Sequence, residues 1–161
     1  MARKPAKRRT DSIDIPGFPD SNSIPYQIYY LSRLMQADFQ ELTAETGTQP
    51  AQAFVLRELW LENPLSQVEI ARNLDTGKAT IGESLKRLER DGFVERVRST
   101  EDGRRIDVCL TSKGKALRVP LAKAAWAQHD MVAALLGAEE ADRFSESLAR
   151  VVEALKTKLN R

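Results

Sequence analysis

The sequence predicts a mainly α-helical fold that carries one small β hairpin. Apolar residues recur at helical spacing over most of the chain after residue 24, which is typical of amphipathic helices. Two of the predicted helices, at 64–74 and 78–92, are short and are joined by the tight turn DTGK, as in a helix-turn-helix. Two strand-like stretches, FVERVR and RIDVCL, flank an Asp-Gly pair, which is a strong hairpin signal.

Composition limits the class of function. The chain has 161 residues, 42% of them hydrophobic, which suits one domain with appendages. Its net charge is only +2, so affinity for nucleic acid would have to come from local patches. One cysteine and one histidine exclude a disulfide framework and a cysteine-rich metal site. We therefore expect that the protein is not an enzyme and that it binds no metal and no cofactor.

The N-terminal segment 1–23 is predicted to be a disordered basic tail. Five of its first nine residues are Lys or Arg, and three prolines discourage regular structure. A solubilising arm and an arm that touches DNA phosphates both remain open. No apolar segment follows the basic start, and no run approaches the roughly 20 residues of a membrane span, so a cytoplasmic location is expected.

The next two helices follow from their apolar spacing. The first runs from Ile24 to about Thr46, and Gly47 is expected to end it. Thr48 is expected to cap the second helix, with Pro50 in its first turn. The apolar stripe of the second helix consists of Phe54, Val55, Leu59 and Trp60.

The predicted helix-turn-helix begins with a capping box, in which Ser66 and Glu69 satisfy each other's backbone amides. In its second helix, three apolar residues fall within about 40° of one another and form a buried stripe: Ile81, Leu85 and Leu88. The opposite face is small near its N-terminus and basic toward its C-terminus, which suits base edges and phosphates. An ordinary solvated face would fit these charges equally well.

Two helices complete the predicted fold. Thr111 or Ser112 caps a long helix that runs to about Leu136, and Pro120 is expected to kink it near residues 116–120. The last helix carries apolar residues at spacings of three and four: Phe144, Leu148, Val151, Val152, Leu155 and Leu159.

The segment 64–117 resembles the winged helix-turn-helix of the multiple-antibiotic-resistance regulator (MarR) family. The most specific pieces are LKRLERDGFVER, the Asp102-Gly103-Arg104 element and LTSKG. The resemblance implies a winged helix-turn-helix DNA-binding domain flanked by N- and C-terminal dimerisation helices. It divides the chain into the tail 1–23, an N-terminal dimerisation helix 24–50, the DNA-binding domain 51–111, and a long helix with the C-terminal dimerisation helix, 112–161.

The same resemblance implies a homodimeric, sequence-specific transcriptional regulator of a pseudo-palindromic double-stranded DNA operator. Members of this family are more often repressors, and a small ligand such as an aromatic acid or a thioester commonly releases them. A ligand-independent or architectural winged-helix DNA-binding protein is the alternative.

The residues implied for DNA contact lie on the second helix and on the hairpin, or wing. Arg104 would enter a minor groove, Asp102 would brace it, Gly103 would allow the tight turn, and Arg105 could reach a phosphate. The full set is Lys78, Ala79, Thr80, Glu83, Lys86, Arg87, Arg90, Asp102, Arg104 and Arg105.

The chain departs from the family's pattern at Glu83 and Lys86, where many relatives carry the opposite signs. Glu83 could accept a hydrogen bond from a cytosine N4, or it could pair with Lys86 three residues away. We favour the ion pair, because a carboxylate near phosphates is electrostatically disfavoured. Base preference cannot be carried over from the family.

Two further sets follow from the resemblance. The expected dimer interface consists of Ile28, Leu31, Leu148, Val151, Val152 and Leu155. The expected ligand pocket has aromatic walls and a cation, and consists of Tyr26, Tyr30, Arg33, Trp60, Trp126 and His129. Core packing is the alternative for each aromatic residue. Cys109 is interpreted as a packing residue, which disfavours thiol-based sensing.

Overall fold

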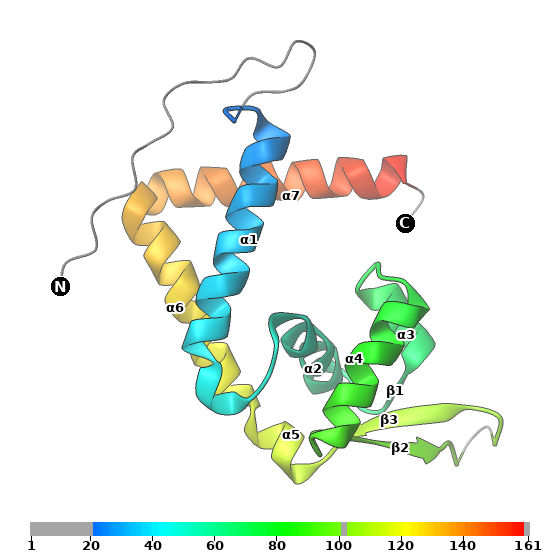
Figure 1. Ribbon diagram of the computed structural model, residues 1–161. Helices are drawn as coiled ribbons and strands as arrows, with labels where there is room; N and C mark the ends of the chain where they lie inside the picture. Colours follow the sequence, from blue (N-terminus) through cyan, green and yellow to red (C-terminus); the bar gives the residue numbers. More distant parts are fainter. Residues whose placement is uncertain (1–20, 101–102, 160–161) are drawn as a thin grey trace. The chain divides into compact units, whose positions relative to one another are not determined.

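The computed structural model describes residues 21–100 and 103–159, and Figure 1 shows the order of the elements. Most of the predicted tail and the wing residue Asp102 therefore lie outside the described residues. The described part of the chain divides into two compact units, with the boundary between Ala37 and Asp38.

Helix α1 (Ile24–Leu42) begins where the apolar periodicity begins, and its residues up to Leu34 are all exposed. The helix ends before the predicted Thr46, because a separate 3-10 turn, η1 (Ala44–Thr46), follows it. Gly47 closes that turn with φ 70°, a left-handed conformation that favours glycine. Gly47 therefore ends η1 and not α1, and the prediction that the first helix continues to about Thr46 is wrong in its last turn.

Helix α2 (Pro50–Leu61) starts at the predicted proline, but its N-cap is Gln49 rather than Thr48. The Gln49 backbone N–H donates to Gln52 Oε1 at 2.7 Å. Thr48 is completely buried, and its hydroxyl lies 2.7 Å from the Thr46 hydroxyl. The predicted Thr48 cap is wrong because this hydroxyl is engaged in the preceding turn.

Helices α3 (Gln67–Asn73) and α4 (Lys78–Arg90) form the predicted helix-turn-helix. The capping box is confirmed: the Ser66 hydroxyl accepts from the Glu69 N–H at 3.3 Å, and the Glu69 carboxylate accepts from the Ser66 N–H at 2.7 Å. Helix α4 buries the predicted stripe, Ile81, Leu85 and Leu88.

A three-stranded antiparallel sheet adjoins the two helices, with strand order β1–β3–β2. Strands β2 (Val94–Arg98) and β3 (Ile106–Leu110) are the predicted hairpin, paired from Val94 opposite Leu110 to Arg98 opposite Ile106. Strand β1 (Leu65–Ser66) was not expected, because two residues cannot show the alternation that identifies a strand. It places Ser66 opposite Asp107 of β3.

The predicted kink in the long helix is confirmed as a break at Leu117, between α5 (Ser112–Ala116) and α6 (Arg118–Leu136). Pro120 lies in the first turn of α6, where a missing N–H leaves no helical bond unmade. Helix α7 (Ala138–Lys158) follows Gly137 and contacts α6.

Gly114 makes the joint between the wing and α5. A Cβ atom at this position would lie 2.0 Å from the Phe93 carbonyl oxygen, at the start of the wing. The Gly114 N–H donates to the capping Thr111 hydroxyl at 3.1 Å, and the Gly114 carbonyl accepts from Trp60 Nε1 at 3.2 Å. The close approach explains why the LTSKG motif has glycine here.

One hydrophobic core holds these elements together. Leu56 of α2, Ile70 of α3, and Leu85 and Leu88 of α4 are completely buried, and Leu121 of α6 joins them. The strands add Val94, Val108 and Leu110. No residue of α7 is buried, so this core ends before the last helix.

Candidate nucleic-acid interface

Helix α4 turns its polar face outward because its three leucine and isoleucine side chains anchor the other face in the core. Lys78, Ala79 and Thr80 begin the helix and are all exposed. The side chain of Gln67 holds this end, since its Nε2 donates to the Lys78 carbonyl at 2.9 Å. Sequence reasoning missed Gln67, because nothing in the sequence shows that it reaches 11 residues ahead.

The turn before α4 is held by a residue in an unusual conformation. Asp75 has φ 48°, a left-handed conformation that aspartate tolerates better than most residues. Its carboxylate lies 2.7 Å from Lys156 Nζ, in the last turn of α7, and this contact raises the pKa of Lys156. The C-terminal helix therefore contacts the helix-turn-helix directly.

The reversed pair on α4 forms an ion pair, as the sequence predicted. Lys86 Nζ lies 2.7 Å from Glu83 Oε1, and about two thirds of each side chain is exposed, at 66% and 64%. The hydrogen bond from Lys86 lowers the pKa of Glu83, so the carboxylate stays charged near neutral pH. Whether Glu83 also reads a base remains a prediction.

We expect Glu83→Ala to separate these two roles. If Glu83 only pairs with Lys86, its loss should change binding little and equally for all sequences, because exposed helix pairs contribute about 0.2–0.5 kcal/mol. Binding is measured to a DNA library in which each base pair is replaced in turn. A change of about 1–3 kcal/mol confined to one base pair would instead assign Glu83 to direct readout.

The remaining basic residues of α4 differ in their engagement. Arg90 is held by its neighbour, with Nε 2.8 Å and Nη2 3.2 Å from the Asp91 carboxylate, and this contact lowers the pKa of Asp91. Lys78 and Arg87 have no ion-pair partner within the described part of the chain. Their charges are the better placed to meet phosphates.

The wing carries Arg104 next to its tip, where the side chain is exposed. The position of Asp102 relative to Arg104 lies outside the described residues. Gly103 has nothing within 4 Å of its Cβ position. Residues 101 and 102 of the same turn lie outside the described residues, so the expected role of Gly103 in the turn stays a prediction. Arg96 of β2 lies 3.5 Å from Glu89 of α4, which ties the wing to that helix.

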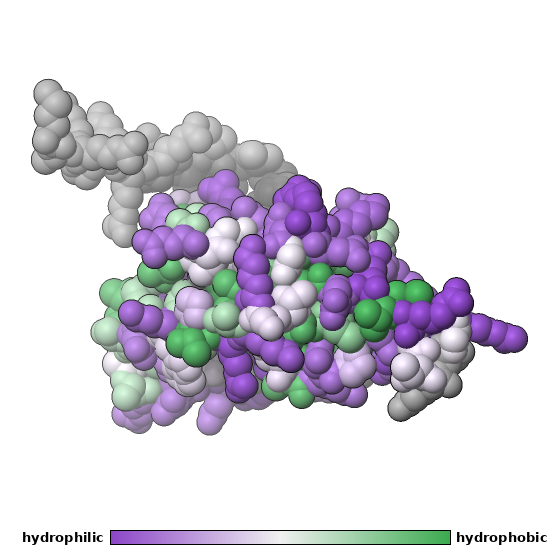
Figure 2. All heavy atoms as spheres, turned by 90° about the horizontal axis from the view of Figure 1, so that it is seen from below, coloured by the Kyte–Doolittle hydropathy of each residue, from purple (hydrophilic) through white to green (hydrophobic). Residues whose placement is uncertain are grey.

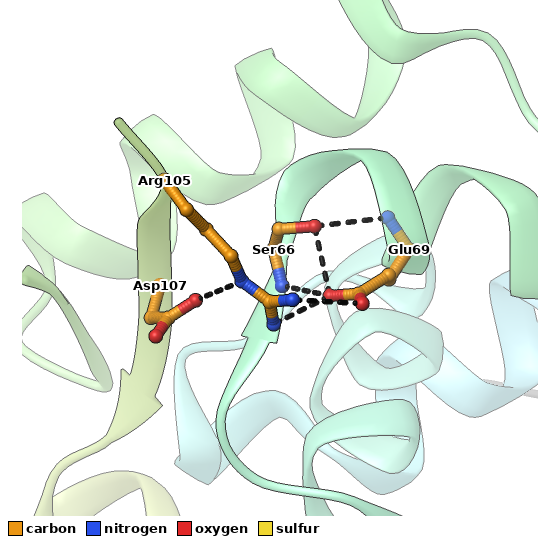
Figure 3. Close-up of polar contacts among 4 residues, drawn as sticks. All are labelled: Ser66, Glu69, Arg105 and Asp107. Atoms are coloured by element: carbon orange, nitrogen blue, oxygen red, sulfur yellow. Dashed lines mark hydrogen bonds and ion pairs between the residues drawn. The ribbon is translucent and has the colours of Figure 1, made fainter. Parts of the chain in front are cut away.

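Arg105 is bound within the chain, as Figure 3 shows. Its Nη1 and Nη2 donate to the Glu69 carboxylate at 3.1 and 2.8 Å, and its Nε donates to Asp107. These two carboxylates raise the pKa of Arg105, with Asp107 as the larger cause. The predicted phosphate contact of Arg105 remains a prediction, and the structure gives this side chain a second role.

One face of the molecule is mixed in polarity. Figure 2 shows one face of the molecule on which hydrophilic side chains predominate and hydrophobic ones are interspersed among them. Hydrophilic side chains of this kind are usually solvated at a protein surface.

Within each unit, some of the residues expected in a ligand pocket contact one another. In the first unit, Tyr26 and Tyr30 stack with centroids 6.2 Å apart, and the Arg33 guanidinium lies 5.3 Å from the Tyr30 ring centre. In the second unit, the rings of Trp126 and His129 pack edge to face, with their centroids 5.2 Å apart. Trp60 instead packs against the core and hydrogen-bonds to α5.

Two surface hollows lie elsewhere. One of about 510 Å³ is on α7, lined by Glu140, Arg143, Phe144 and Ser147. Another of about 490 Å³ lies beside the helix-turn-helix turn and includes Arg72 and Lys78. Neither contains a residue that was expected to bind a ligand.

All six residues expected at a dimer interface are exposed in the single chain. On α7 the exposed fractions are 36% for Leu148, 45% for Val151, 52% for Val152 and 50% for Leu155, and on α1 they are 40% for Ile28 and Leu31. Cys109 is half-buried, and burial raises the pKa of its thiol, which disfavours the reactive thiolate.

The described residues contain no group of three or more His, Cys, Asp or Glu side chains that could hold a metal ion. Over the same residues, no helix has the length and apolar character that crossing a membrane would require.

Comparison with known proteins identifies the family. The MarR family model matches residues 49–106, which include α2, the helix-turn-helix and most of the hairpin. The solved transcriptional repressor CouR, bound to a DNA duplex, is 30% identical, with a TM-score of 0.72 over 82% of this chain and 94% of that chain. The chain belongs to the MarR family.

Curated MarR-type relatives agree with this assignment. The transcriptional regulator MgrA of Staphylococcus aureus is 30% identical over 105 residues, which are 64% of this chain and 69% of MgrA. The repressor YetL of Bacillus subtilis is 36% identical over 94 residues, 58% of this chain and 56% of YetL. The transcriptional regulator TtmR of Methylorubrum extorquens is 33% identical over 93 residues, 58% of this chain and 48% of TtmR. The matched part of the chain therefore spans about half the length of YetL and of TtmR. They are named as transcriptional regulators, not as enzymes.

Proposed function

We propose that this MarR-family chain is a homodimeric, sequence-specific DNA-binding transcriptional regulator, and that it acts as a repressor. One observation carries the proposal: a helix with an exposed, small and basic face and a wing with an exposed arginine are both fixed to the same core. Relatives named as repressors and a repressor solved on DNA support it. A DNA partner implies a cytoplasmic location.

Each part of the surface has a proposed task. Ala79 and Thr80 at the start of α4 approach base edges in the major groove, where small residues permit close contact. Lys78, Lys86 and Arg87 contact phosphates. Arg104 enters the adjacent minor groove, whose negative potential is greatest in narrow A·T-rich tracts.

The proposed dimer uses the exposed apolar residues of α1 and α7. Exposed apolar residues that recur along a helix, as Leu148, Val151, Val152 and Leu155 do on α7, favour an association surface. Two copies related by a two-fold axis read half-sites about 34 Å apart, which makes the operator pseudo-palindromic. We retain the division into 24–50, 51–111 and 112–161 as part of this proposal.

Selection from a random duplex library tests the proposal. We expect enrichment of inverted half-sites whose centres are about 10–10.5 base pairs, or a multiple of that, apart. Failure to enrich any sequence, together with tight binding of the unselected library, would favour the alternative of an architectural DNA-binding protein.

We expect Arg104→Ala to weaken binding to the selected duplex and to reduce the preference for A·T-rich flanks. The reason is that an arginine in a narrow minor groove reads groove width and not a single base. Binding to duplexes that differ only in their flanks measures the effect. Arg143→Ala, an exposed arginine on α7, is the control. Equal flank preference in both variants would remove the wing from the mechanism.

The proposed effector is a small aromatic anion. The Tyr30–Arg33 and Trp126–His129 pairs each offer an aromatic face with a basic group, which suits an aromatic acid or its thioester. Thermal-shift screening with these compounds, followed by DNA release, is the test. Stabilisation without DNA release would separate binding from regulation, and no stabilisation would favour the ligand-independent alternative.

A further inference from the structure

We infer that Arg105 is a positioning residue that fixes the wing against helix α3 and thereby sets how Arg104 meets DNA. The part of this inference that concerns DNA rests on the proposed function. The part that concerns the wing does not, because it follows from contacts within the free chain.

The Arg105 guanidinium contacts two carboxylates at once. Its two terminal nitrogens grip one carboxylate, Glu69, at 3.1 and 2.8 Å, and its Nε binds a second, Asp107. A forked arginine–carboxylate contact of this kind is stronger and more directional than a neutral hydrogen bond. Asp107 is buried, at 7% exposed, so its partner is fixed on the protein side and not in solvent.

Glu69 also belongs to the N-terminal cap of helix α3. The same carboxylate accepts from the Ser66 N–H at 2.7 Å and from the Ser66 hydroxyl at 2.8 Å, which closes the N-terminal cap of α3. The Ser66 backbone hydrogen bond is the largest cause of the lowered pKa of Glu69, with Arg105 contributing. The carboxylate therefore stays ionised near neutral pH and joins the cap to the wing.

The contacts of Arg105 with Glu69 and Asp107, here called the clamp, lie at the base of the wing. Asp107 pairs with Ser66 across β1 and β3, and the Arg105 carbonyl accepts from the Ser99 N–H at 2.9 Å, beyond the last paired residues of the hairpin. Arg105 thus sits between the anchored sheet and the exposed Arg104. A second tie, Arg96 to Glu89, is longer at 3.5 Å.

The positive charge of Arg105 is already paired within the chain. Two carboxylates surround one guanidinium, and 37% of the Arg105 side chain is exposed. Its positive charge is therefore offset before any phosphate approaches. A clamp predicts that losing Arg105 changes the wing's reading of DNA but leaves the salt dependence unchanged, whereas a phosphate contact predicts that the salt slope falls by about one.

The DNA-independent test is amide hydrogen exchange of the free, full-length chain. Arg105→Gln should speed exchange at Ser99 and along β3 by about tenfold or more, while Arg104→Ala should leave these amides unchanged. Arg105→Lys should restore part of the protection. Unchanged exchange in Arg105→Gln would overturn the inference, whether or not the protein binds DNA. Asp107→Asn removes the other side of the clamp and should act in the same direction.

The DNA test uses Arg104→Ala, Arg105→Gln and the double variant. Arg105→Gln should lower affinity for the selected duplex by about tenfold, the scale of one lost specific contact, with loss of flank preference. Because it acts through Arg104, the double variant should bind no worse than Arg104→Ala alone. Additive losses with a reduced salt slope would assign Arg105 to a phosphate instead. If Arg105→Gln exchanges faster but the wild-type protein shows no sequence preference, the clamp stands and the proposed function is rejected.

Discussion

Val152→Asp is expected to convert the protein to a monomer and to weaken binding to a two-half-site duplex by about 100-fold or more. Val152 is 52% exposed in the single chain and belongs to the apolar stripe of α7 with Leu148, Val151 and Leu155. A carboxylate placed in an apolar interface costs several kcal/mol, and each 1.4 kcal/mol is about tenfold in affinity. Light scattering gives the mass, and a gel shift gives the affinity.

Thr157→Asp is the matched control for this substitution. Thr157 lies on the same helix, about 140° around its axis from Val152, and is also exposed. It adds the same charge without entering the stripe, so the variant should remain dimeric and bind normally. A Val152→Asp protein that keeps the dimer mass would contradict the assignment of the α7 stripe to the interface.

Gly114→Ala is expected to lower the free energy of unfolding by about 3 kcal/mol. The new methyl group would lie 2.0 Å from the Phe93 carbonyl oxygen and 3.2 Å from a Leu110 methyl carbon, so backbone must move. The same carbonyl accepts hydrogen bonds from the Thr111 N–H and hydroxyl, each at 3.2 Å, and these weaken with it. Chemical denaturation measures the change.

Gly103→Ala is the control for this stability effect. Gly103 has nothing within 4 Å of its Cβ position, so the added methyl group meets no neighbouring atom. Its free energy of unfolding should stay within about 0.5 kcal/mol of that of the wild type. Equal stability of the two variants would show that the contact at Gly114 is not tight in solution.

Local patterns in the sequence predicted most of the fold. The buried stripe of α4, the Ser66–Glu69 cap and the break near Pro120 each depend on residues within one or two turns of one another. The Thr48 cap failed for a local reason too, because a neighbouring hydroxyl competes for the side chain.

Contacts between distant residues could not be predicted in this way. Arg105 and Glu69 are 36 residues apart, and Lys156 and Asp75 are further apart still. Charge alone made Arg105 look like a phosphate contact, because the sequence does not show that β1 brings Glu69 alongside β3. The family resemblance supplied the roles of the helices and the wing, but it could not supply a clamp that depends on this chain's own Asp107.

The most direct test of the central claim is the ratio of two dissociation constants, measured at one salt concentration with the full-length protein. One duplex carries the selected pseudo-palindrome, and the other carries the same bases in scrambled order. A sequence-specific regulator should bind the first at least about 10³-fold more tightly. A ratio near one, with both affinities falling together as salt is raised, would contradict the claim and leave a non-specific DNA-binding protein.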